Sequence, residues 1–250
     1  MAKTAVFDSE DTLIKVYDSG KAAKTAHKGA TDLKFVSEKD FAPISQLGSS
    51  PQVLLVNSKV PAKTVAEFVA YAKAQPQPLA YGGGGGPGSA SNLIMALFLN
   101  RAELKMTSVS YRGTAPALTD VIGGQIPTTF VPISEAVAQA TNPAIRILAV
   151  SSEKRARQLP DVPAVAEYYK GFRTITWNGF LAPTGTPQPV IDTVAREVAR
   201  IVREPEIVAN LEKIGVDPLG NTPAQFAAFL RAEAPVWRDA VKAAGVRPEQ

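Results

Sequence analysis

Residues 81–93, YGGGGGPGSASNL, follow a short extended stretch and run into a helix whose apolar residues recur at helical spacing. Because glycine has no Cβ, a bound group can approach this backbone closely, and the helix start offers unpaired N–H donors that favour an anion. The hydroxyls of Ser89 and Ser91 can cap the helix or contact a ligand. The segment therefore predicts a cradle for a small carboxylate. The alternative is a flexible surface turn.

The glycine run does not match the nucleotide-binding fingerprints. A Walker loop ends in Gly-Lys-Ser/Thr, whereas Gly88 is followed by Ser89 and Ala90. A dinucleotide-binding loop needs an acidic residue at the end of a second strand, and the nearest candidate, Glu103, follows the helix directly. The pattern does not favour a nucleotide site of either kind.

Composition narrows the functional classes. The 250 residues, 45% hydrophobic and 20% charged, describe a soluble globular chain of one large domain or two ordinary ones. The net charge of +4 is spread along the chain, which argues against nucleic acid but suits a small anion. With no cysteine and one histidine, His27, the sequence offers no thiol nucleophile and no zinc cluster. We expect a protein that is not an enzyme and holds no cofactor or metal.

The N-terminal sequence does not read as a secretory signal. Acidic residues Asp8, Glu10 and Asp11 interrupt the apolar core that a signal peptide requires. The sequence also has no apolar stretch long enough for a membrane span. Taken as written, the chain would stay in the cytoplasm.

Strands and helices are expected to alternate through most of the chain, and the last seventy or so residues to be helical. We expect strands at residues 12–17, 53–57, 109–111, 126–131, 145–151 and 172–182, and helices near residues 115–122, 135–140, 164–169 and 206–214. Further helices start after Thr64, at Pro189 and after Thr222, where Thr64 with Glu67 and Thr222 with Gln225 form capping boxes. This alternation predicts an α/β fold with mainly parallel sheets and ligands beyond the carboxyl ends of the strands.

Seven motifs in one order carry a resemblance to a known family. They are EKDFAPIS (residues 38–45), GSAS (88–91), YRGTAPAL (111–118), GGQ (123–125), LAVSSEKR (148–155), LPDVPAVAE (159–167) and WNGFLAPTGTP (177–187). Together they resemble the substrate-binding proteins of tripartite tricarboxylate transporters, the Bug-type extracytoplasmic receptors. The similarity extends over nearly the whole chain from about Thr12 onward.

This resemblance implies a type II periplasmic-binding-protein-like α/β fold with a ligand cleft between two lobes. Domain 1 would combine residues 1–50 and 178–250, and domain 2 would be residues 51–177. The chain would cross between them near residues 46–51 and 178–182, which would form the hinge. Members of the family bind small organic carboxylates in the periplasm and deliver them to membrane permease subunits. We expect the same of this chain, acting as a monomer.

The resemblance also implies a set of ligand-binding residues. Those in domain 1 are Asp18, Ser19 and Gly20, and those in domain 2 are Gly85, Gly86, Gly88, Ser89, Ser91, Tyr111, Gly113, Thr114 and, after Phe130, Val131. Arg112 could add a charge, but an arginine at a cleft edge is more often solvated or paired.

The sequence departs from the family pattern in several places, including the glycine run, which is one residue longer than usual, and Pro127 and Val131, where many members carry acidic or polar residues. The Pro-Pro-Gly-Gly loop with which the family usually begins, and which grips a carboxylate, is absent, and Asn92 stands where histidine is frequent. With its first strands missing, domain 1 would be incomplete, the chain would be N-terminally truncated, and binding would be weak or lost. Two interpretations remain open: a carboxylate receptor whose start lies further upstream, or a degenerate member that keeps the fold without binding. A third and less favoured interpretation is an enzyme that uses an α/β cleft.

Overall fold

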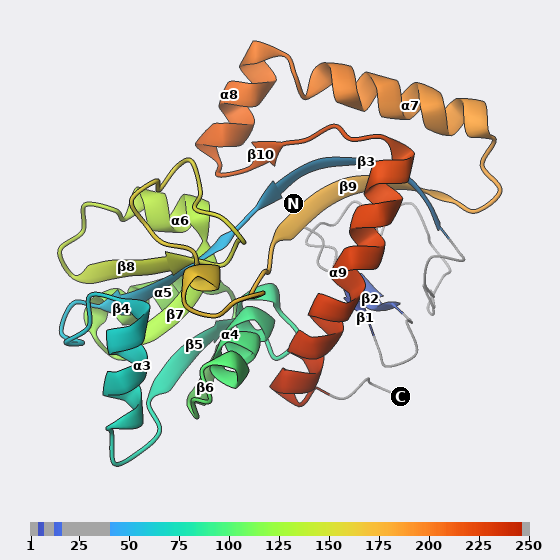
Figure 1. The fold of residues 1–250 in the computed structure, drawn as a ribbon. Coiled ribbons are helices and arrows are strands. Elements are labelled where there is room, and N and C mark those ends of the chain that lie inside the picture. The colour runs from blue at the N-terminus through green and yellow to red at the C-terminus, as the bar shows by residue number, and fades with distance from the viewer. Residues whose placement is uncertain (1–4, 8–12, 17–40, 247–250) are drawn as a thin grey trace.

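The computed structural model describes residues 5–7, 13–16 and 41–246, and Figure 1 shows their arrangement. Strands β1 (Ala5–Phe7) and β2 (Leu13–Val16) form a two-stranded antiparallel sheet. The rest of the described chain builds two further sheets. Of the helices in these residues, none combines the length and the apolar character needed to cross a membrane.

The larger sheet has five strands in the order β6-β5-β7-β4-β8. The strands are β4 (Gln52–Asn57), β5 (Ala80–Gly84), β6 (Thr107–Tyr111), β7 (Thr128–Pro132) and β8 (Ile145–Val150). Strand β5 runs parallel to β6 and β7, whereas β4 runs antiparallel to β7 and β8. The sheet is therefore mixed.

Helices cover both faces of this sheet because β4 is apolar on both sides. Leu54 and Val56 point into the same core as α3 (Val65–Lys73) and α4 (Ala90–Arg101). Val53 and Leu55 point to the opposite core, beneath α5 (Thr114–Gly123) and α6 (Ile133–Ala138). Such a doubly covered strand reads as a continuous apolar run, and this is why the sequence located it well.

The smaller sheet is antiparallel and has the order β10-β3-β9. It is made of β3 (Phe41–Ser50), β9 (Thr176–Pro183) and the short β10 (Asp217–Pro218). Helix α7 (Gln188–Ile201) packs on it through a small apolar cluster that contains Ile44 and Ile191. Helix α8 (Pro205–Lys213) then leads into β10.

The chain passes between the two sheets at Pro51, where β3 gives way to β4, and again before β9. Helix α9 (Pro223–Ala244) contacts both units, as Figure 1 shows in red. Near its start, Phe226 packs edge-on against Trp177 of β9, and further along Trp237 joins the core beside α4. Because α9 bridges the sheets in this way, the division into residues 1–50 with 178–250 and residues 51–177 stays a prediction.

The expectation of mainly parallel sheets was wrong. The strands of the β5-α4-β6-α5-β7 segment do run parallel, as helical crossovers require. Strand β4, however, enters directly from β3 of the other sheet, without a crossover helix, and lies antiparallel to both neighbours. The direct connection from β3 sets the direction of β4. Hydrophobic periodicity carries no information about strand direction.

Several element boundaries also differ from the predicted ones. The strand expected at residues 172–182 begins only at Thr176, and the helix expected at 164–169 is a single 3-10 turn, Val165–Glu167. The capping box at Thr222 is present, whereas the one at Thr64 is incomplete. There the Glu67 carboxylate accepts from the backbone N–H of Lys63, at 2.6 Å, instead of from that of Thr64.

Candidate functional site

Three connections meet at the carboxyl ends of the parallel strands. Residues 85–89 follow β5, residues 112–113 follow β6, and α6 follows β7 directly. The first two touch each other, since the Gly85 N–H donates to the Tyr111 carbonyl at 2.8 Å. A Cβ on Gly84 would lie only 2.7 Å from the backbone N of Thr114. The sheet register thus brings together loops that lie about 25 residues apart.

The five glycines divide into two groups with different physical roles. Gly82 to Gly84 are buried in β5, where a Cβ on Gly82 would come within 2.9 Å of the Ala117 side chain. Gly85 and Gly86 have φ angles of +88° and +90°, a conformation that L-residues rarely adopt, and a Cβ on Gly86 would meet no atom of the described residues within 4 Å. The backbone open to a ligand therefore begins at Gly85.

The two serines after the glycines are already engaged in the protein. Ser89 is the N-cap of α4, and its hydroxyl accepts from the Asn92 N–H at 3.4 Å. Ser91 is buried, and its hydroxyl donates to the Gly84 carbonyl at 3.0 Å. Ser91 therefore fixes the end of β5, while Ser89 and Gly88 are partly accessible at the start of α4.

The second loop leads into α5 without a capping side chain. Gly113 is the N-cap residue, and in the described part of the chain no side chain accepts a hydrogen bond there from the first turn of the helix. Uncapped N–H groups at a helix start carry the positive end of the helix dipole. Thr114, the first residue of α5, donates its hydroxyl proton to Oε1 of Glu135 at 2.6 Å. The other oxygen of Glu135 is buried and has no hydrogen-bond partner among the described residues.

Tyr111 is tied to α5. Its phenol donates to the Asp120 carboxylate at 2.7 Å. Burial, with the hydrogen bond to Asp120 and its charge, raises the pKa of Tyr111 to about 12. The phenol therefore stays protonated at neutral pH and joins β6 to α5.

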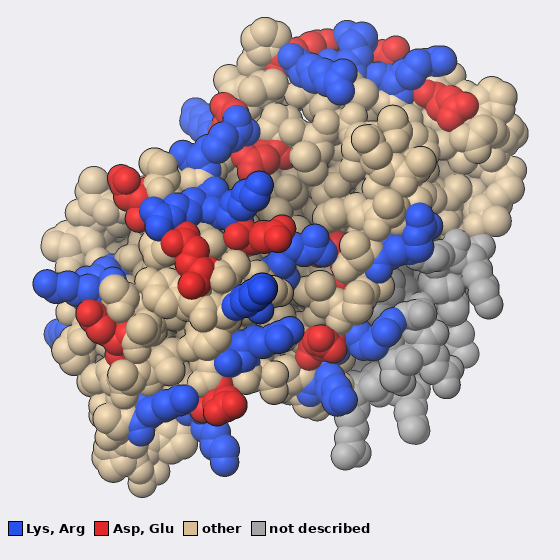
Figure 2. Space-filling model, viewed as in Figure 1, with Lys and Arg blue, Asp and Glu red and all other residues tan. Residues whose placement is uncertain are grey.

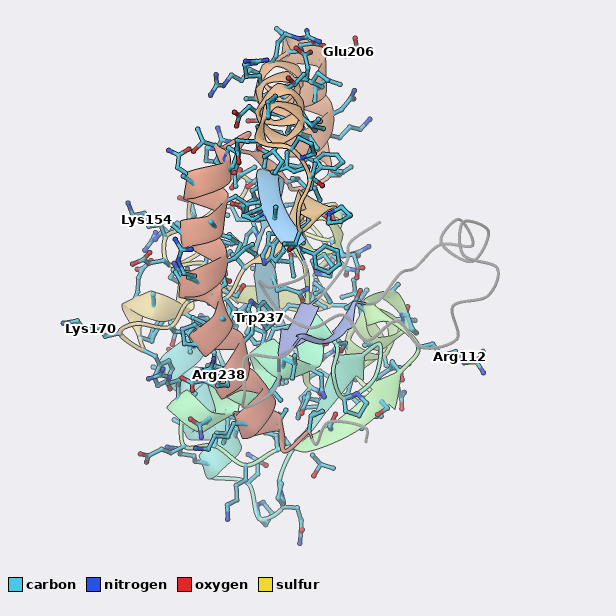
Figure 3. All side chains as sticks on the ribbon, turned by 90° about the vertical axis from the view of Figure 1, so that its right-hand side faces the viewer. Arg112, Lys154, Lys170, Glu206, Trp237 and Arg238 are labelled. Atoms are coloured by element: carbon cyan, nitrogen blue, oxygen red, sulfur yellow. The ribbon has the colours of Figure 1, made fainter. Side chains whose placement is uncertain are left out.

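The remaining predicted residues divide into three cases. Arg112 is exposed and projects away from the ribbon body in Figure 3. Val131 has an exposed fraction of 0% and packs in the core below α5, so only its backbone could contact a ligand. Asp18, Ser19 and Gly20 lie outside the described residues.

On the face shown in Figure 2, over which α9 runs, Lys and Arg side chains alternate with Asp and Glu, without a large region of one sign. In the described part of the chain, no three His, Cys, Asp or Glu residues come together in a way that could hold a metal ion.

A family model described as the tripartite tricarboxylate transporter family receptor, TctC, matches residues 7–246. The chain belongs to this receptor family. Among curated relatives, BugT of Bordetella pertussis is 27% identical over 210 residues, which are 84% of this chain and 64% of BugT. A UPF0065 protein from the tcbD-tcbE intergenic region of Pseudomonas sp. strain P51 is 28% identical over 206 residues, 82% of this chain and 61% of that protein. This receptor-family chain thus spans less than two thirds of the length of either relative.

Solved structures of similar proteins confirm the predicted two-lobed, type II periplasmic-binding-protein-like α/β fold. An R. palustris protein with adipate is 29% identical and superposes with a TM-score of 0.73, covering 88% of this chain and 73% of that one. MatC from Rhodopseudomonas palustris with bound malate is 26% identical, with a TM-score of 0.68, covering 84% and 73% of the two chains. The family description is of a receptor, and a further solved relative, BugD, is a periplasmic binding protein, which supports the expectation that this receptor-family chain is not an enzyme.

Glu135 was not among the site residues expected from the sequence. It lies in the first turn of α6, directly after β7, and its contact with Thr114 brings it beside the second loop. The available signal was its place just after the carboxyl end of an expected strand, where side chains of α/β proteins gather.

Proposed function

We propose that this chain is a receptor for a small organic carboxylate, held against residues 85–89 and 113–114. The observation that carries the proposal is the direct contact of these two loops, one with an open glycine turn and one leading into an uncapped helix start. The relatives with adipate and malate support a carboxylate as the ligand class.

The chemistry of the two loops fits such a ligand. A carboxylate oxygen accepts several hydrogen bonds, and backbone N–H groups at helix starts and in glycine turns donate them in fixed directions. The starts of α4 and α5 add the positive ends of their helix dipoles. Because Arg112 points into solvent, recognition rests on the backbone, which favours carboxylates as a class over one particular acid.

The proposal extends to the rest of the receptor's task. Asp18, Ser19 and Gly20 would contact the ligand from the other lobe, and the loaded protein, a monomer, would present its ligand to the membrane subunits of a transporter. These subunits face the periplasm, so the receptor would act there. Relatives in the family are periplasmic binding proteins, which supports this location.

The test is calorimetric titration with adipate, malate, other dicarboxylates and aromatic acids, into the millimolar range. We expect the wild type to bind at least one of them and Gly86→Val to lose binding, since valine cannot adopt the required φ without strain. Gly185→Val is the matched control. Gly185 also has φ +90° and nothing within 4 Å, but it lies in the turn between β9 and α7.

Two results would contradict the proposal. Equal affinity of Gly86→Val and the wild type would remove the glycine turn from the site. A wild type that binds none of these acids would favour the other interpretation, a family member that keeps the fold without a ligand.

A further inference from the structure

Asn92 forms a buried polar junction behind the glycine turn. It lies in the first turn of α4 with an exposed fraction of 7%. Its Oδ1 accepts from the Tyr81 hydroxyl and from the Ser108 hydroxyl, each at 3.1 Å, and its Nδ2 donates to the Pro87 carbonyl at 2.8 Å. A carbonyl can only accept, so the contact with Pro87 fixes which end of the amide faces the turn. One carboxamide therefore connects α4, β5 and β6 to residues 85–88.

Gly83 of β5 lies next to this junction and leaves the space that the junction occupies. A Cβ on Gly83 would lie 2.7 Å from Oδ1 of Asn92 and 2.9 Å from the Ser108 hydroxyl oxygen. The φ of Gly83 is not in the left-handed region, so lack of space is what requires a glycine there. Replacement of Gly83 would thus displace the amide that reaches the turn.

Among the residues that the structure describes, few other contacts define the shape of the turn. Gly85 donates to the Tyr111 carbonyl, and the Ser89 N–H donates to the Gly86 carbonyl at 3.1 Å. Gly85 and Gly86 have no side chains to pack, and a Cβ on Gly86 would find open space. The bond from Asn92 to Pro87 is therefore the contact by which a buried side chain holds the middle of the turn.

We propose that Asn92 is a positioning residue that holds residues 85–88 in the conformation that receives the ligand. The inference rests on the proposed function, because it assigns Asn92 to the same site. Asn92 would not touch the ligand. It would lower the entropy that the turn must lose when a ligand is bound, and so raise the affinity.

The bond to Pro87 and the bond from Tyr81 can be broken separately. Asn92→Asp keeps the shape and both acceptor contacts, but it turns a carboxylate oxygen toward the Pro87 carbonyl and loses the donor. Asn92→Leu removes all three hydrogen bonds of the amide, without adding a charge beside an anion site. Tyr81→Phe is the matched control, because it removes a donor to Oδ1 and leaves the contact with Pro87 in place.

The first readout is amide hydrogen exchange of Gly85 and Ser89 in the unliganded protein, because their N–H groups are hydrogen-bonded at the turn. We expect exchange to rise about tenfold or more in Asn92→Asp and Asn92→Leu, and to stay near the wild-type rate in Tyr81→Phe. The second readout is the affinity for the acid that binds best. We expect it to fall about tenfold in both Asn92 variants and to change less than about twofold in Tyr81→Phe.

Unchanged exchange in Asn92→Asp would overturn the proposal, and so would an equal loss of affinity in Tyr81→Phe, which would mark Asn92 as an ordinary core residue. If the wild type binds none of the acids, the proposed function fails. The exchange rates of the three variants then decide by themselves whether Asn92 holds the turn.

Discussion

Replacing Arg173 with methionine should destabilise the protein more at pH 8 than at pH 5. The reason is Glu233, a carboxylate on α9 with an exposed fraction of 2%. Arg173 approaches it to 2.8 Å, and the indole N–H of Trp237 donates to it at 3.1 Å. Trp237 lies on the side of α9 that faces the rest of the protein in Figure 3. The ion pair therefore joins α9 to the segment that precedes β9.

The direction of the pH effect follows from the pKa of Glu233. Burial raises this pKa above its ordinary value of 4.5, while the charge of Arg173 and the bond from Trp237 act to lower it. A carboxyl group with a raised pKa binds its proton more tightly in the folded state. The contribution of Glu233 to the free energy of unfolding is thus highest below pH 4.5 and falls as the pH rises through the folded-state value. Without Arg173 the pKa of Glu233 rises further, so the stability lost in Arg173→Met grows toward pH 8.

The magnitude can be bounded from the geometry. Removing one partner of a fully buried ion pair costs roughly 3–5 kcal/mol. The Arg173 side chain is 34% exposed, so solvent screens part of the attraction, and we expect about 2–3 kcal/mol at pH 8. For a chain of this size, that lowers Tm by roughly 4–12 °C.

The assay is urea unfolding at pH 5 and pH 8, followed by far-UV circular dichroism. The control is the double variant Arg173→Met with Glu233→Gln, in which no buried charge is left unpaired and much of the stability at pH 8 should return. An equal loss for Arg173→Met at both pH values, or a double variant no more stable than the single one, would refute the reasoning.

Three further predictions concern other contacts. Gly179→Ala should cost about 1–3 kcal/mol in urea unfolding, because the new Cβ would lie 2.5 Å from the Phe226 ring; no change would mean that α9 shifts freely. Thr222→Ala removes the N-cap of α9 and should lower the free energy of unfolding by about 1 kcal/mol, whereas Thr222→Ser should not. Tyr111 should remain un-ionised until about pH 12, because burial and Asp120 raise its pKa. The raised pKa stabilises the folded state below pH 10, and this stabilisation is lost as the pH rises toward 12. Ultraviolet titration of the wild type, compared with Tyr111→Phe, would measure the ionisation of Tyr111.

The sequence predicted those elements well whose signal is local. Strand β4 is an unbroken apolar run, and α9 starts at a threonine cap followed by proline, so both lie where expected. The long strand β3 was not recognised, because its residues, FAPISQLGSS, include proline and glycine and no regular alternation. Its partner β9 lies more than a hundred residues away in the chain, and no local pattern reports such a pairing.

The candidate site shows the same limit. The glycine turn was recognisable because its composition is unusual. The division of roles within it was not, since the need for glycine at Gly83 depends on Asn92 and Ser108, which meet it only in the folded chain. The sequence likewise predicted that Ser91 would contact a ligand, but in the folded chain its hydroxyl donates to the Gly84 carbonyl.

The φ angles of Gly85 and Gly86 also decide whether an L- or a D-residue fits the turn. Values of +88° and +90° are unfavourable for L-residues but are the mirror image of a region that they occupy readily. A D-alanine introduced at Gly86 by semisynthesis would meet no such strain, and in the unfolded chain it would have fewer conformations than glycine. By the reasoning that applies to compatible glycine replacements, it would stabilise the protein by about 0.4–1 kcal/mol. The turn would accept a side chain of the opposite chirality and reject the natural one.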